Sequence, residues 1–535
     1  MKKIISMATL ALLVTIGVGA QNIYDAVKFS GNTLNGTARF VGMGGAMGAL
    51  GGDISTIGVN PAGIGIYRSN DAMTTFSFSA METKSDFLDS SFKKNKNRFQ
   101  FDNIGLVFSN KIGEYTPLRY VNFGFSYKRN TSLNKLMSMA GDIPGVNDDY
   151  PLSQTNQMVN QANLMYDVGY DIATLGGNLL EDGNVGWLAA LGWMGWLYNP
   201  VENASGYIGH LPRTYSQFYS KESGGIDEFN FNMSLNISER VYLGFTVGLY
   251  EINYKKYSIY DESYPANGDP WGYSLESWNK TDGSGFDLKL GAIVRPFEYS
   301  PLRIGVAIHT PTYYTLAHRT SAYLIYDNME NDKGEMVSGE IDTYEKLGGK
   351  DASFKYRLQT PWKYNFSLGY TIGANLALGA EYEYQDYSTM KFRYADYQGG
   401  SMWWETGTAK DMLKGVSTFR MGAEYKFVPE FALRAGYSLS TSAYKDIAFK
   451  ELPENSVITD TDYANTKAIS NYTFGFGYRG KNFYADLAYR YNTYKEDFYA
   501  FYDADVDHQY YENRLPKTYM KNNNHQVLMT LGTRF

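Results

Sequence analysis

The chain has 535 residues, no cysteine and a formal net charge of −7 that is spread along its length. These features exclude a disulfide-stabilised scaffold and provide no basic surface for nucleic acid. No apolar run after the first twenty residues is long enough for a transmembrane helix. Aromatic residues make up 16% of the chain, and it has 54 glycines and a mean hydropathy of −0.38, which together fit a transmembrane β-barrel.

Residues 1–20 have the pattern of a secretory signal peptide. Lys2 and Lys3 precede a mainly apolar run over residues 4–18, and small residues at 19 and 20 offer a cleavage site. A membrane anchor is the alternative, but the run is short for a span. We expect the mature chain to begin at Gln21, and the absence of cysteine excludes a lipoprotein.

Residues 21–70 are expected to form a segment of their own before the first strand. It contains the stretch GMGGAMGALGGDISTIGVNPAGIG, which is too rich in glycine for a stable helix. Glycine lets one backbone pass close to another, and Pro61 favours an extended conformation at Asn60. We predict that this segment folds back into a barrel as a hatch. Its apolar side chains either line a path for an apolar ligand or pack the hatch against itself.

Residues 71–535 contain fourteen segments in which apolar and polar residues alternate with a period of two. In HQVLMTLGTRF, for example, Val527, Met529, Leu531 and Phe535 share one face, while Arg534 lies on the other. Charged residues on the second face suit a wet lumen better than a dry core. The predicted strands are 71–81, 100–110, 118–129, 228–238, 241–254, 284–295, 302–311, 361–371, 374–387, 417–428, 431–440, 471–479, 482–491 and 525–535.

The links between these strands alternate between short and long, as they do in outer-membrane barrels. The long links, which we assign to the outer side, are 82–99, 130–227, 255–283, 312–360, 388–416, 441–470 and 492–524. The sequence therefore predicts an all-β protein, a 14-stranded antiparallel transmembrane β-barrel with an N-terminal hatch inside the lumen. A large soluble β-sandwich or β-propeller is the alternative, but neither architecture explains why short and long links alternate.

The longest outer link contains the apolar stretch NVGWLAALGWMGWLYNP. It places Trp187, Trp193 and Trp196 beside leucines, and it is too short to span a membrane. An exposed apolar helix here would be a candidate surface for ligand capture. The alternative is that this stretch is buried by the fold of its own loop.

Other candidate sites give weak signals. The five histidines are scattered, although His309 and His318 bracket one strand end, so we predict no metal site. YDADVDH lacks the glycine and terminal glutamate of a calcium-binding EF-hand loop. No Gly-x-Ser-x-Gly elbow and no complete dinucleotide motif occurs. We therefore predict neither catalytic residues nor a cofactor, although a triad assembled from distant strands stays possible in principle.

The stretch ARFVGMGGAMGALGGDISTIGVNPAGI followed by fourteen strands resembles the FadL family of outer-membrane transporters, which includes the TodX-type channels. Asn60, Pro61 and Ala62 match the NPA motif of the family's hatch. The resemblance implies capture of a hydrophobic molecule at outer loops, transfer to a site inside the barrel, and release sideways after the hatch shifts. It also implies a wall opening at a kink in the third strand, where Gly124 is the only glycine; plain packing is the alternative for Gly124.

The resulting prediction is an outer-membrane channel of a Gram-negative cell for uptake of hydrophobic small molecules, either long-chain fatty acids or aromatic hydrocarbons, by hatch-gated passive diffusion. A nonspecific porin or a surface-binding barrel is the alternative. The expected partners are the hydrophobic ligand, outer-membrane lipid and lipopolysaccharide, and the barrel assembly machinery, with no nucleic acid. One departure from the family is that its known capture groove is built from later loops than 130–227.

Overall fold

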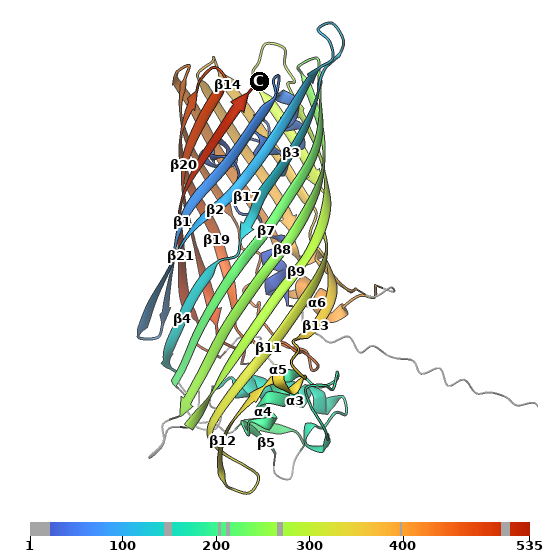
Figure 1. Ribbon diagram of the computed structural model, residues 1–535, viewed down its shortest axis with the longest axis vertical. Coiled ribbons are helices and arrows are strands. Elements are labelled where there is room, and N and C mark those ends of the chain that lie inside the picture. The colour runs from blue at the N-terminus through green and yellow to red at the C-terminus, as the bar shows by residue number, and fades with distance from the viewer. Residues whose placement is uncertain are drawn as a thin grey trace, which may run out of the picture.

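The computed structural model is a long closed barrel with helical segments inside it and a helical cap at one end (Figure 1). It describes residues 22–143, 152–201, 205–209, 215–264, 271–395, 399–503 and 514–535. The predicted signal peptide lies outside these residues. No helix in the described part of the chain is long and apolar enough to cross a membrane.

Fourteen strand positions form the wall, and the predicted strand number is therefore confirmed. In order they are β1 (Asp71–Phe87), β2 (Ser90–Lys111), β3 (Leu118–Ser132) with β4 (Lys135–Asp142), β7 (Tyr215–Ile237), β8 (Val241–Tyr264), β9 (Trp271–Val294), β10 (Arg303–His309) with β11 (Tyr313–Glu330), β14 (Lys363–Ile372) with β13 (Ala352–Gln359), β15 (Leu376–Asp386) with β16 (Lys391–Tyr394), β17 (Gly415–Val428), β18 (Phe431–Ser440), β19 (Tyr463–Arg479), β20 (Phe483–Tyr499) and β21 (Thr518–Arg534). Antiparallel pairing of β1 with β21, from Asp71↔Arg534 to Asp86↔Tyr519, closes the barrel.

The alternation that predicted the strands separates a lipid-facing surface from the lumen. In β21, Val527 and Met529 are exposed, whereas the residues on either side of them, Gln526, Leu528 and Thr530, are buried. The same holds around the wall, where exposed aromatic and aliphatic side chains form a continuous apolar belt. Such a belt on a closed barrel is what a bilayer requires, because hydrogen bonds between neighbouring strands satisfy the backbone groups at this level.

The strands extend further on the outer side than the sequence predicted. The link predicted at 82–99 is a continuous hairpin, in which β1 runs to Phe87 and β2 starts at Ser90. The prediction was wrong because both faces of this hairpin carry polar residues, so the period-two signal of apolar residues fades where the strands leave the membrane. Turns on the opposite side are short; β7 and β8, for example, are joined by Ser238, Glu239 and Arg240.

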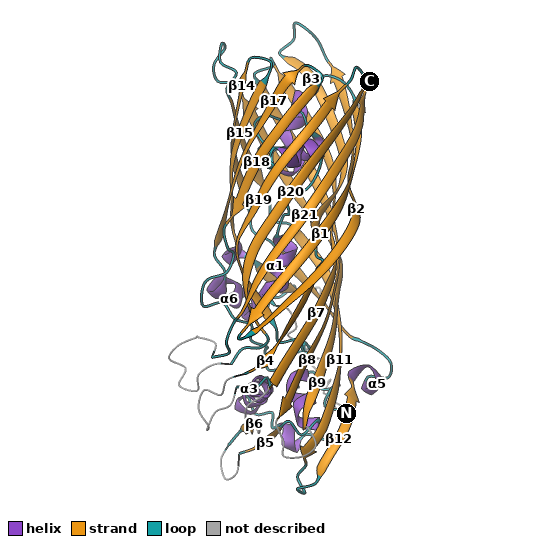
Figure 2. Ribbon diagram, turned by 90° about the vertical axis from the view of Figure 1, so that its left-hand side faces the viewer, coloured by secondary structure: helices purple, strands orange, loops and turns teal. Residues whose placement is uncertain are grey.

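The hatch lies inside the barrel and consists of short helices. They are α1 (Ile23–Ser30), α2 (Ala38–Gly42), η1 (Ile54–Gly58) and η2 (Pro61–Ile66). Figures 1 and 2 show α1 in the outer half of the lumen and the remaining hatch helices nearer the end that carries the C-terminus. α2 contacts β18 to β21, and η2 contacts β7 to β9, so the hatch touches opposite parts of the wall.

The wall has glycine where the hatch backbone comes closest. A Cβ atom at Gly436 would lie 2.2 Å from the amide nitrogen of Gly44, and one at Gly422 would lie 2.2 Å from the carbonyl oxygen of Met43. Gly44 itself has a φ of +61°, which favours glycine. Backbone-to-backbone contact of this kind explains why the hatch is rich in glycine.

A helical cap covers the outer side of the barrel. Its elements are α3 (Thr155–Asp167), η3 (Ile172–Thr174), α4 (Trp187–Met194), β5 (Tyr198–Pro200), β6 (Tyr207–Gly209), β12 (Met336–Asp342) and α5 (Thr343–Lys346), while η4 (Tyr387–Thr389) and α6 (Trp403–Met412) lie closer to α1. The cap shares an apolar core with the 441–462 loop, for example through Leu452 and Ile458. Loops and cap therefore form one packed unit.

The substitution Gly436→Ala is expected to displace the hatch, because the added methyl group meets backbone that cannot move aside locally. We expect higher ion conductance of the single barrel in a planar bilayer. Gly407→Ala is the matched control, since no atom lies within 4 Å of the Cβ it would add. Equal conductance of the two variants would contradict this packing account.

Candidate functional site

The outer half of the lumen contains a cavity of about 380 Å³. Its floor is formed by α1 and the hatch residues that follow, and its walls come from β1, the β3–β4 junction and β17 to β21. Apolar side chains such as Leu34, Met81, Met137 and Phe498 line part of it, together with several tyrosines. The cavity is thus enclosed by hatch and wall together, so movement of the hatch would change its shape.

Helix α1 is held against the wall by an ion pair and by aromatic contacts. The Lys28 ammonium donates to a Glu222 carboxylate oxygen at 2.8 Å and to the Tyr254 hydroxyl at 2.7 Å. Tyr24 stacks on Tyr444 with ring centroids 5.1 Å apart. At the start of the helix, the Asn22 side chain accepts from the amide of Asp25 at 2.8 Å. These contacts fix the hatch at its outer end.

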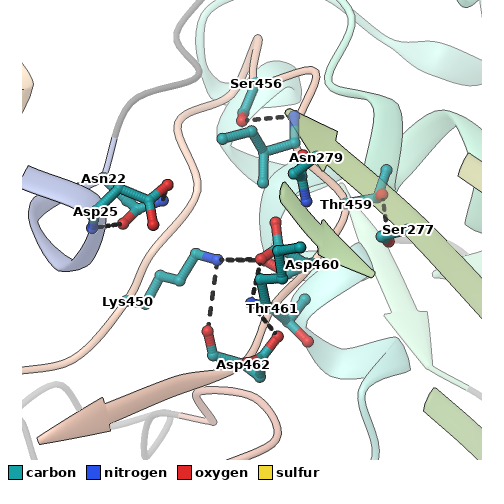
Figure 3. Close-up of polar contacts among 12 residues, drawn as sticks. Asn22, Asp25, Ser277, Asn279, Lys450, Ser456, Thr459, Asp460, Thr461 and Asp462 are labelled. Atoms are coloured by element: carbon teal, nitrogen blue, oxygen red, sulfur yellow. Dashed lines mark hydrogen bonds and ion pairs between the residues drawn. The ribbon is translucent and has the colours of Figure 1, made fainter. Parts of the chain in front are cut away.

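A buried charge cluster joins the 441–462 loop to β8, above α1. The Lys256 ammonium contacts Asp460 at 2.5 Å and Asp462 at 2.7 Å, and Lys450 reaches Asp460 at 3.3 Å. Figure 3 shows Lys450, Asp460 and Asp462 close to Asn22 and Asp25 of the hatch. Burial alone would raise the pKa of Asp460, but the two ammonium groups outweigh it and hold that pKa well below its usual range.

The charges that line the cavity balance in number. The cationic residues are Lys28, Lys135, Lys256, Arg420, Lys450, Lys467 and Arg490, and the anionic residues are Asp25, Glu82, Glu222, Glu383, Asp460, Asp462 and Glu496. Most of them form ion pairs with one another. Arg490 differs: it is 3% exposed, donates to the Leu34 carbonyl, and forms no ion pair with a carboxylate of the described residues.

Side-chain amides form a large share of the polar groups of the cavity. The lining includes Asn22, Asn32, Asn35, Gln100, Asn130, Asn134, Gln385, Asn471, Asn492, Asn522, Asn523, Asn524 and Gln526. Several of their buried oxygens, such as those of Asn130 and Gln526, have no hydrogen-bond partner in the described part of the chain. The cavity thus combines apolar patches with a hydrogen-bonding wall, which suits a ligand that has both characters.

Pairing between β2 and β3 stops partway along the barrel. It runs from Lys111↔Tyr120 to Asn103↔Lys128 and ends there, while β3 and then β4 continue along β7. β2 has a bulge at Asp102 at this height, and the register between β3 and β7 shifts between Arg129 and Thr131. The cavity reaches both sides of this break, since Gln100 and Asn130 line it.

β3 is regularly paired at Gly124, the residue proposed for a wall kink. Gly124 is paired without a register shift to Val107 on one side and Asn232 on the other. A Cβ at this residue would lie 3.3 Å from Ile57 of the hatch. Close packing against the hatch, rather than a bend of the strand, therefore accounts for this glycine.

The NPA motif does not line the cavity; it docks the hatch on the wall. The Asn60 side chain accepts from the Ala62 amide at 3.1 Å and donates to the Ala292 carbonyl at 3.1 Å. The Pro61 carbonyl accepts from the Ser234 hydroxyl at 2.8 Å. Both Asn60 and Ala62 are fully buried. The motif thus joins η2 to β7 and β9.

The tryptophan-rich stretch forms α4, and this helix is part of the core of the cap. Trp187 is 1% exposed and its indole donates to the Leu180 carbonyl at 3.2 Å. Trp193 and Trp196 are partly buried and pack against the same core. An exposed apolar helix for capture is therefore absent from this part of the described structure, because the loop folds over its own apolar residues.

No sequence pattern indicated α1 as a cavity floor. None indicated the cluster of Lys256 with Lys450, Asp460 and Asp462 either, since Lys256 is far from the other three in the chain. Asp505 and Asp507 of the acidic loop lie outside the described residues. His318 binds within the wall, with its ring nitrogens 2.9 Å from Thr281 Oγ1 and 3.1 Å from Asn279 Oδ1. Among the described residues no three metal-ligating side chains gather.

Comparisons with known proteins place this architecture among solved structures. No family model and no curated protein matches the sequence. A FadL homologue from Pseudomonas aeruginosa aligns with a TM-score of 0.51 and 11% identity, over 94% of this chain and 99% of that chain. The toluene transporters TodX of Pseudomonas putida and TbuX of Ralstonia pickettii align over 94% of this chain and 99% of theirs, at 11% and 12% identity and TM-scores of 0.47 and 0.42.

The closed wall, apolar belt and filled lumen define a multi-pass barrel of the Gram-negative outer membrane. Its fold is that of the FadL homologue, with a hatch inside fourteen strands. The resemblance inferred from the glycine-rich segment is thus confirmed for the fold.

The substitution Lys256→Gln should loosen the 441–462 loop, because it leaves two buried carboxylates without their main cation. Breaking a buried ion pair in this way costs about 3 to 5 kcal/mol. Hydrogen exchange of residues 456–462 should therefore become on the order of 100- to 1,000-fold faster. Lys467→Gln is the control: its side chain is 44% exposed, and its pair with Asp497 contributes little. Unchanged exchange in Lys256→Gln would contradict the role of the cluster.

Proposed function

We propose that this protein is an outer-membrane channel that takes up hydrophobic small molecules by passive diffusion, gated by movement of the hatch. The observation that carries the proposal is the cavity that hatch and wall enclose together, which extends to the break between β2 and β3. A ligand held there lies beside a place where two wall strands share no hydrogen bonds. The fold shared with the FadL homologue supports the same function. No chemical step is required for it, in keeping with a protein that is not an enzyme.

The lining favours one of the two ligand classes expected. Aromatic hydrocarbons offer no hydrogen bonds, and the amide wall around them would stay unsatisfied. A long-chain fatty acid presents both an apolar chain and a carboxylate. Arg490 is a buried guanidinium that lines the cavity; Asp102 is close enough to act on it electrostatically, but no carboxylate of the described residues lies within ion-pair distance. We therefore propose a long-chain acid, with its carboxylate at Arg490.

A nonspecific porin is the second candidate, and the charged lumen is the observation that favours it. Its ion pairs, such as Arg434 with Glu424 at 2.6 Å and with Asp486 at 2.7 Å, are buried beneath the hatch. A porin would need a free aqueous path past that hatch, whereas Gly42 to Gly48 pack tightly against wall atoms. Outer-membrane lipid, lipopolysaccharide and the barrel assembly machinery remain the partners that we propose for such a barrel.

Because the chain has no cysteine, a single disulfide can test the gate. In a Gly42→Cys/Gly475→Cys variant, each new Cβ would lie 3.2 to 3.3 Å from the other residue's Cα, close enough for a bond between α2 and β19. We expect uptake of a fluorescent long-chain fatty acid by cells that express the oxidised variant to fall to background. Reduction should restore it.

The two single-cysteine variants are the controls, and both should transport under either condition. Equal uptake by the oxidised and reduced double variant would exclude gating by this part of the hatch. Free passage of small hydrophilic solutes in both states would instead favour the porin.

A further inference from the structure

Four lysines form a row across adjacent strands on the outer surface. Lys84 of β1 lies directly opposite Lys93 of β2 and Lys521 of β21, and Lys521 lies opposite Lys495 of β20. Figure 2 shows β20, β21, β1 and β2 side by side on one face. Like charges directly opposite one another on a sheet repel and destabilise it. A row of four therefore requires compensating negative charge.

The protein supplies only part of that charge. Lys84 contacts Asp86 at 2.9 Å, and Lys93 contacts Glu82 at 2.5 Å. Both lysine side chains remain at least half exposed. Lys495 and Lys521 are also exposed, and neither forms an ion pair with a carboxylate of the described residues. The half of the row formed by Lys521 and Lys495 is thus left without a counter-charge.

The row has a fixed height above the apolar belt. Phe78, Phe99, Val527 and Tyr489 form an exposed row of their own on the same four strands, six residues towards the membrane. Six residues correspond to about 20 Å along a strand, or roughly 15 Å along the membrane normal at the usual tilt. The two rows in between are mostly polar. The lysines therefore lie beyond the hydrocarbon, at the level of the sugars and phosphates of the outer leaflet.

We propose that this row, Lys84, Lys93, Lys495 and Lys521, is a binding site for the phosphate groups of one lipopolysaccharide molecule. Adjacent strands are about 4.8 Å apart, so the four ammonium groups extend over roughly 14 Å. That length matches several phosphates carried on one saccharide better than a single free phosphate ion. Charge-assisted hydrogen bonds from ammonium groups to phosphate oxygens replace the repulsion with attraction.

The location connects this site to the break in the wall. The outer part of β2, from Ser90 to Phe101, pairs with β1 but not with β3. The β1–β2 hairpin thus has a free edge beside the break. A glycolipid held across β2, β1, β21 and β20 ties this hairpin to its neighbours on the other side.

The test uses the whole barrel in detergent and measures its affinity for lipopolysaccharide by titration in native mass spectrometry. The variant replaces all four lysines of the row with glutamine: Lys84→Gln, Lys93→Gln, Lys495→Gln and Lys521→Gln. A control variant makes the same change of charge at four exposed lysines away from the row: Lys333, Lys346 and Lys350, which follow β11, and Lys355 of β13. Heat-modifiable mobility on gels confirms that each barrel is folded. The probes are lipopolysaccharide with a phosphorylated inner core and the same preparation after phosphatase treatment.

We expect the unmodified protein and the control to bind phosphorylated lipopolysaccharide equally, and the row variant to bind it at least tenfold more weakly. Phosphatase-treated lipopolysaccharide should bind the unmodified protein as weakly as the row variant binds the intact glycolipid. Equal affinity of the row variant and the control would overturn the proposal. So would binding that does not depend on the phosphates, since it would show that the acyl chains alone are recognised.

Discussion

The structure depends on close approach between the hatch backbone and a barrel wall that lacks side chains at the points of contact. Glycines of the wall, such as Gly422 and Gly436, face Met43 and Gly44 of the hatch at distances that leave no room for a Cβ. This contact explains the composition of residues 42–65 and places α1 high in the lumen. The cavity, its floor and its link to the break in the wall follow from that placement.

Fixed charges then determine how firmly each part is held. α1 is tied to β7 by Lys28 and Glu222, and the 441–462 loop is tied to β8 by the cluster around Lys256. Buried pairs of this kind add directional constraint more than net stability. Because the charges of the cavity mostly neutralise one another, the groups left for a ligand are amides, apolar patches and Arg490. A molecule with an apolar chain and one acidic group fits that combination.

The wall could be predicted from the sequence because a strand between lipid and lumen must alternate in polarity, as in Val527 and Gln526. The outer extensions of the strands could not be predicted. They lie outside the membrane, where Lys84 and Lys93 have polar neighbours on both faces of the strands and no apolar face marks the period of two. The glycine-rich stretch predicted the hatch. The role of Gly124 in the wall was not predicted, because close packing against a neighbour and a bend in a strand both favour glycine. The sequence shows that α4 is apolar, but whether this helix is exposed or buried depends on the cap that surrounds it. Contacts such as Lys256 with Asp460 join residues 204 positions apart and leave no local pattern.

The central claim is that the cavity above the hatch holds an amphipathic acid, and native mass spectrometry of the purified barrel tests it most directly. The account predicts one long-chain fatty acid per barrel, retained from the cell or bound on addition, and its loss in an Arg490→Gln variant that still folds. A barrel that retains no such molecule and binds none on addition would contradict the account. Binding that is unchanged in Arg490→Gln would contradict the assigned anchor.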